Sequence, residues 1–93
     1  MPAYVYILAS QKNGTLYTGS TTDLARRMDE HRQKVVDGFT AKHGVTRLVF
    51  AEEHPTTMSA RQREAYIKKW KRAWKIEMIE RENPHWEDLA KFF

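Results

Sequence analysis

Residues 4–19 read Tyr-Val-Tyr-Ile-Leu-Ala-Ser-Gln-Lys-Asn-Gly-Thr-Leu-Tyr-Thr-Gly, two short apolar segments joined by a polar turn. Asn-Gly between two strand-like segments is the strongest short-range signal for a β-hairpin. We therefore expect antiparallel strands over residues 4–9 and 16–19. Gly19 is expected to mark a sharp turn out of the second strand, because glycine has no Cβ to restrict the backbone. The hairpin predicts fixed positions for the tyrosine side chains on its two strands.

A helix is expected to follow the hairpin and to end before Gly38. Its buried side is formed by apolar residues at helical spacing, namely Leu24, Met28 and Val35. Arg27 and His31 are four residues apart beside this stripe, so their side chains leave the helix on one side. Thr21 or Thr22 is expected to cap the first turn. This helix adds a guanidinium and an imidazole to the phenols of the hairpin.

The second half of the chain predicts one more strand and two further helices. The uninterrupted apolar run at residues 48–50 indicates a strand in a central position of the sheet. Residues 58–82 follow a helical pattern with two apolar stripes on different sides. Trp70 and Trp74 belong to the first stripe and are expected in the core. One straight helix cannot bury both stripes, so we expect two helices that separate close to Trp70.

These elements predict an α+β fold, a small three-stranded antiparallel sheet flanked by helices, with residues 1–93 as one domain. A net charge of +4 and a pI near 9.5 favour an anionic partner. The lack of cysteine excludes disulfides and thiolate chemistry. The longest apolar run, from Ala3 to Ala9, is too short to span a bilayer. We expect a soluble cytoplasmic protein with no membrane partner.

Two tyrosine triplets and the predicted first helix carry a recognisable order of residues. The triplets are Tyr4-Val5-Tyr6 and Tyr17-Thr18-Gly19. Arg27 follows ten residues after Tyr17, and His31 lies one helical turn further on. In this order and spacing the residues resemble the GIY-YIG nuclease family. The joint spacing makes the match specific, whereas either triplet alone recurs by chance.

The resemblance extends from Tyr4 to about Leu89 and includes two later residues. Glu64 is similar to the metal-binding glutamate of the family, and Asn83 is similar to its late asparagine. Tyr4 stands where the family name has glycine, and Thr18 stands where it has isoleucine. Neither of these two positions carries the chemistry of the family.

The resemblance implies divalent-metal-dependent hydrolysis of DNA by water, as in an endonuclease of DNA repair, recombination or processing, with a 5′-phosphate product. It implies Tyr17 as general base with Tyr6 in support, although a phenol with a pKa of about 10 needs perturbation for this role. It also implies Arg27 on the phosphate and one Mg²⁺ or Mn²⁺ ion on Glu64. His31 is expected to relay a proton or to bind phosphate.

Each of these residues also has a structural explanation. The two tyrosines can be half-buried hairpin residues with hydrated hydroxyl groups. Glu64 can pair with Lys68 at i, i+4 spacing, which needs no metal. A lone helix histidine such as His31 is often structural. No cluster of Asp, Glu or His residues predicts a preformed metal cage, so the ion is expected to arrive with the nucleic acid.

Basic residues are concentrated in the second half of the chain, where eight of the sixteen lie between Met58 and Glu82. Such a helical surface can bind phosphates without sequence preference. The residues expected to contact nucleic acid are Arg26, Lys42, Arg63, Lys68, Lys71 and Asn83. DNA is the expected partner, with targeting by a homodimer or a partner protein. The alternatives are a non-catalytic nucleic-acid-binding module of the same ancestry and, more weakly, a protein-interaction domain.

Overall fold

The computed structural model describes residues 2–33 and 44–93 and contains a three-stranded sheet. The strands are β1 (Ala3–Ala9), β2 (Leu16–Thr21) and β3 (Arg47–His54), in the order β2-β1-β3 and antiparallel at both pairings. The predicted antiparallel sheet and hairpin are confirmed. The hairpin closes through Asn13, whose φ of 59° is the left-handed conformation that asparagine tolerates well.

The expected central position of the third strand is wrong, because β1 occupies the centre and β3 is an outer strand. The apolar run at residues 48–50, which suggested a central strand, comes from a β-bulge instead. Ile7 pairs with Phe50 and Leu8 pairs with Leu48, so Val49 is an extra residue on β3. A bulge places consecutive residues on one side of the sheet. Val49 and Phe50 therefore enter the same core while Leu48 enters the other, which explains the apolar run.

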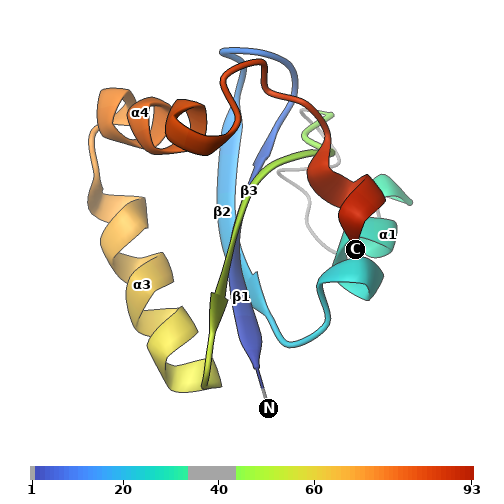
Figure 1. The fold of residues 1–93 in the computed structure, drawn as a ribbon, viewed down its shortest axis with the longest axis vertical. Helices are drawn as coiled ribbons and strands as arrows, with labels where there is room; N and C mark the ends of the chain where they lie inside the picture. The colour runs from blue at the N-terminus through green and yellow to red at the C-terminus, as the bar shows by residue number, and fades with distance from the viewer. Residues whose placement is uncertain (1, 34–43) are drawn as a thin grey trace.

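In the part of the chain that the structure describes, three α-helices and a short 3-10 helix cover the two faces of the sheet. They are α1 (Leu24–Arg32), α3 (Thr57–Lys69), α4 (Arg72–Glu82) and η1 (Leu89–Phe92). Figure 1 shows α3 and α4 on one face, with α1 and η1 on the other. Among the residues that the structure describes, no helix has the length and apolarity needed to cross a membrane.

The helix boundaries follow local backbone geometry. The expected separation of two helices near Trp70 is confirmed, because Trp70 and Lys71 have extended backbones with ψ of 151° and 147°. The N-cap of α1 is Asp23 rather than either preceding threonine, since its carboxylate accepts from the Arg26 backbone N–H at 3.1 Å. The expected helical positions beyond Gln33, including that of Val35, lie outside the described residues.

The alternation of β1 divides the interior into two cores. Val5 and Ile7 pack towards α3 and α4 in the first core. Tyr6 and Leu8 pack towards α1 in the second core. The expectation that Trp74 is a core residue is wrong, because 52% of its surface is exposed, whereas Trp70 is half-buried against the first core.

Candidate active site

Three ring side chains meet between β1, β2 and α1. The Tyr6 hydroxyl and His31 Nε2 are joined by a buried hydrogen bond of 3.1 Å, in which the tautomer of His31 decides the donor. The Tyr17 ring centroid lies 5.5 Å from that of His31 and 6.4 Å from that of Tyr6. Tyr6 and His31 are each 1% exposed, whereas Tyr17 is half-buried. Tyr17 is therefore the member of this cluster that reaches the surface.

The Tyr6 phenol crosses the backbone of Gly19, its partner in the β1–β2 register. A Cβ on Gly19 would lie 2.6 Å from the Tyr6 hydroxyl oxygen and 2.7 Å from the ring carbon that bears it. Both distances are shorter than real Cβ contacts allow. The expected turn at Gly19 is wrong, because this residue lies within β2 and the positive-φ glycine among the described residues is Gly44. Gly19 provides space for the phenol.

Arg27 lines a cavity of about 180 Å³ at the end of β2, between α1 and the start of α3. Its guanidinium Nε lies 3.7 Å from a Glu30 carboxylate oxygen, and its side chain is 38% exposed. Ser20 and Arg61 line the same cavity. We did not assign a site role to either from the sequence. Arg61 lies one helical turn before Glu64, which is the spacing that could have indicated it.

Glu64 reaches this region from α3, on the other face of the sheet. Its Oε1 accepts from the Ser20 hydroxyl at 2.5 Å, and its Oε2 lies 2.6 Å from Lys68 Nζ. Successive side chains of a strand point to opposite faces, so Tyr17 packs towards α1 while Ser20 meets α3. The candidate residues thus surround the outer strand β2. Ser20 connects Glu64 to the cavity that Arg27 lines.

The side chains near Glu64 fit a metal site with a single protein carboxylate as ligand. The described residues contain no group of three or more His, Cys, Asp or Glu side chains placed to hold an ion. Magnesium commonly takes one or two protein carboxylates and completes its coordination with water and substrate phosphates. A single carboxylate that accepts from Ser20, which lines the same cavity as Arg27, fits such an ion. Binding through Oε2 would replace the ion pair with Lys68.

The residues expected to contact nucleic acid come from several different elements. Arg26 extends from α1 with 77% of its side chain exposed and lies 3.7 Å from Glu30. Lys71 is exposed at the start of α4. Arg63 pairs with Glu52 at 3.2 Å, and Lys68 pairs with Glu64. Lys42 lies outside the described residues.

Asn83 is buried, with 5% of its surface exposed, and its side-chain amide is engaged within the protein. Its Nδ2 donates to the carbonyls of Val49 and Glu87 at 3.1 and 2.9 Å, and its Oδ1 accepts from the Glu87 N–H at 3.0 Å. This burial favours a structural role for Asn83 over the expected direct nucleic-acid contact, which stays a prediction. Val49 is the extra residue of the bulge, so Asn83 satisfies a carbonyl there and fixes the C-terminal segment.

Comparisons with known proteins identify the family and the fold of the chain. A family model described as the GIY-YIG catalytic domain matches residues 2–77. The UPF0213 protein CPE1444 of Clostridium perfringens is 35% identical over 88 residues, covering 95% of this chain and 94% of that protein. The UPF0213 protein of Syntrophus aciditrophicus is 38% identical over 82 residues, covering 87% and 92%. The solution NMR structure of the UPF0213 protein BH0048 from Bacillus halodurans matches with a TM-score of 0.58 and 33% identity, covering 98% and 96%.

Proposed function

The chain belongs to the GIY-YIG catalytic domain family, and from this membership we propose that it is a DNA endonuclease dependent on one Mg²⁺ or Mn²⁺ ion. The family indicates a nuclease-type function on nucleic acid. The proposal of a metal-dependent endonuclease rests on one observation, the placement of a phenol cluster, an arginine and a carboxylate around β2. Such groups can supply the general base, the phosphate contact and the metal ligand for phosphodiester hydrolysis by water. The proposal takes residues 1–93 as one catalytic domain.

The phenols divide into a reactive group and its support. Tyr17 is half-buried and can meet a water at the surface, so it is the general base of the proposal. Tyr6 is buried and fixed by His31, so both residues act by positioning the Tyr17 ring. This assignment gives His31 an indirect role.

Arg27 and Glu64 provide the electrostatic part of the proposed reaction. The guanidinium of Arg27 presents a fork of donors to phosphate oxygens and keeps its charge at any working pH. Glu64 would hold the divalent ion, which supplies positive charge to the phosphate and acidity to a bound water. Ser20 fixes one oxygen of that carboxylate, so the other oxygen points to a defined position.

The test compares the wild-type protein with Glu64→Ala and Arg27→Ala on labelled single-stranded, duplex and branched DNA, with and without Mg²⁺ or Mn²⁺. Arg32→Ala is the matched control, because Arg32 is another ion-paired arginine of α1 but does not line the cavity at Ser20. We expect metal-dependent cleavage by the wild type and by Arg32→Ala. Arg27→Ala should be slower by about 100- to 1,000-fold, the usual cost of one transition-state donor. Glu64→Ala should not cleave.

Other outcomes would overturn parts of this proposal. Equal cleavage by the wild type and Glu64→Ala would mean that Glu64 is not the metal ligand or that a contaminating nuclease cuts. Equal losses in Arg32→Ala and Arg27→Ala would remove the assignment of the phosphate contact. Because self-association or a partner protein is the expected route to targeting, the assay is repeated across a range of protein concentrations.

The ion pair between Glu64 and Lys68 favours a second candidate, a module of the same ancestry that binds nucleic acid without cleaving it. In that case Lys68 is the permanent partner of Glu64. Lys68→Ala distinguishes the two functions. In the nuclease it should lower the metal concentration needed for cleavage by a few-fold, because a partly exposed ion pair contributes only about 0.2–1 kcal/mol. In the binding module no variant cleaves, and Lys68→Ala only weakens salt-sensitive binding.

A further inference from the structure

A second cavity lies between α3, α4 and β3, away from the candidate active site. Its volume is about 310 Å³, at the lower end of the range for small-ligand sites. It receives Arg63 from α3, whereas the neighbouring Glu64 contacts Ser20 on β2. The two sites therefore lie on different sides of α3. None of the residues assigned to catalysis lines this second cavity.

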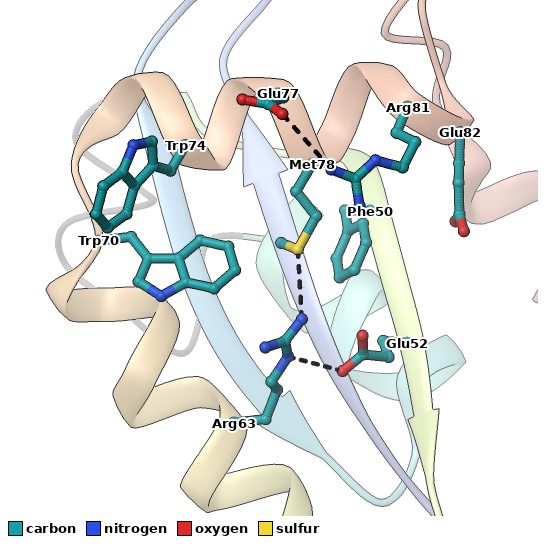
Figure 2. A pocket seen from close by; sticks show the side chains of 9 residues that line it. All are labelled: Phe50, Glu52, Arg63, Trp70, Trp74, Glu77, Met78, Arg81 and Glu82. Carbon is teal, nitrogen blue, oxygen red and sulfur yellow. Dashed lines mark hydrogen bonds and ion pairs between the residues drawn. The ribbon is translucent and has the colours of Figure 1, made fainter.

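One wall of this cavity is aromatic and unusually exposed. Trp70 and Trp74 lie beside one another with ring centroids 6.5 Å apart and a steep angle of 77° between their planes. Figure 2 shows the two indoles on one side of the cavity, with Phe50 and Glu52 on the opposite side and Met78 between them. Trp74 is 52% exposed, so an indole surface is left open to a flat apolar ligand.

The rim of the cavity carries two arginine–glutamate pairs and the further carboxylate of Glu82. Arg63 Nε lies 3.2 Å from Glu52 Oε1, and Arg81 lies 3.6 Å from Glu77. The Arg63 guanidinium also stacks at 5.2 Å over the Trp70 ring. Each pair presents a donor group beside an acceptor group. The edge of a nucleobase likewise presents donors beside acceptors, and its face is flat and aromatic.

A positive charge lies beside the open indole. Lys71 Nζ lies 5.7 Å from the centroid of the Trp74 ring. The neighbouring sequence carries further basic residues, Lys69, Arg72 and Lys75, of which Arg72 donates to the carbonyls of Asn13 and Gly14. An aromatic surface for bases next to cations for phosphates is the combination that single-stranded nucleic-acid sites use. A free apolar ligand would gain nothing from these lysines, whereas a polyanion with exposed bases uses both features.

We propose that this cavity holds one unpaired base of a single-stranded nucleic acid, stacked on Trp74, with the adjoining phosphates on Lys71 and its basic neighbours. The proposal rests on the proposed function only in taking nucleic acid as the partner. It adds a substrate class, because a fully paired duplex cannot place a base in the cavity. Single-stranded, gapped or branched substrates would therefore bind better than a duplex of the same length.

The test measures equilibrium binding of a labelled oligonucleotide of about 10 nucleotides, near the usual single-strand site size, in EDTA so that no cleavage occurs. Trp74→Ala is compared with Tyr66→Ala, because Tyr66 is a 67% exposed aromatic of α3 that does not line the cavity. Loss of one stacked base should weaken binding by Trp74→Ala about 5- to 150-fold. Tyr66→Ala should bind like the wild type, and Trp74→Phe should retain part of the affinity. Duplex binding should be equal in all four proteins.

The inference is overturned if Trp74→Ala binds the oligonucleotide as tightly as the wild type, if Tyr66→Ala loses as much, or if duplex binding falls equally. Thermal unfolding of each variant verifies that a loss of binding does not come from a loss of folding. Failure of the proposed catalysis is a separate result. A protein that never cleaves but shows Trp74-dependent binding supports the cavity assignment. Glu64-dependent cleavage with unchanged oligonucleotide binding in Trp74→Ala overturns only the cavity assignment.

Discussion

Replacing Gly19 with alanine should destabilise the protein because the new methyl group would occupy the position of the Tyr6 phenol. The added Cβ would meet the Tyr6 hydroxyl oxygen at 2.6 Å and its ring carbon at 2.7 Å. The phenol is 1% exposed and cannot swing into solvent. The ring must therefore shift within a packed core, and the 3.1 Å bond to His31 Nε2 would be stretched or lost.

Two costs add to the expected magnitude. Overpacking of a core by a methyl group costs about 1–3 kcal/mol. Leaving the buried Tyr6 and His31 polar atoms without their bond costs about 1–3 kcal/mol more. We expect Gly19→Ala to lower the free energy of unfolding by about 2–6 kcal/mol, a large share of the ~5–15 kcal/mol typical of a domain.

Urea unfolding followed by circular dichroism measures this loss in the wild-type and Tyr6→Leu backgrounds. A leucine at position 6 ends short of the phenol hydroxyl, so most of the cost of Gly19→Ala should disappear there. Gly44→Ala is the control, because its Cβ meets nothing within 4 Å but its φ is +62°. The cost of Gly44→Ala comes from the backbone and should be the same in both backgrounds. A Gly19→Ala cost below about 1 kcal/mol, or one that Tyr6→Leu leaves unchanged, would refute the steric argument.

Two further variants test other contacts of the structure. Ser20→Ala removes the hydroxyl that donates to Glu64 Oε1, so the Mn²⁺ concentration for half-maximal cleavage should rise about 10- to 100-fold. Ser20→Thr retains a hydroxyl for this bond and should behave like the wild type. No change in Ser20→Ala would show that Ser20 does not position Glu64. Asn83→Ala leaves the Val49 carbonyl without its donor, so the free energy of unfolding should fall by about 2–3 kcal/mol, with unchanged DNA affinity of the folded protein. Weaker DNA binding by a fully folded Asn83→Ala protein would restore the direct contact.

The parts of the fold that were predicted from the sequence depend on near neighbours. The hairpin follows from an Asn-Gly turn, and the separation of α3 from α4 follows from two stripes that one helix cannot bury. The proximity of Tyr17 and His31, whose ring centroids lie 5.5 Å apart, follows from the strand and helix periods for the same reason. Local patterns were sufficient for these features.

The errors arose where a distant residue decides the local structure. The β3 bulge is held by Asn83, which lies 34 residues from Val49, and no pattern within β3 shows it. Ser20 and Glu64 are 44 residues apart, so their hydrogen bond was not predictable from spacing. In the sequence, Trp74 continues the apolar stripe of α3. The extended backbone at Trp70 and Lys71 changes the direction of the chain, and Trp74 is therefore exposed.

The register of β2 links the two halves of the candidate site. Tyr17 must face α1 and Ser20 must face α3 at the same time, and a slip of one residue would exchange these faces. The β1–β2 pairing sets Tyr6 against Gly19, the one position of β2 whose residue has no Cβ to meet the phenol. A slip would place Thr18 or Ser20 under the Tyr6 ring. The glycine therefore does more than relieve a clash, because the space it leaves fixes the register that brings phenols and carboxylate to opposite sides of one strand.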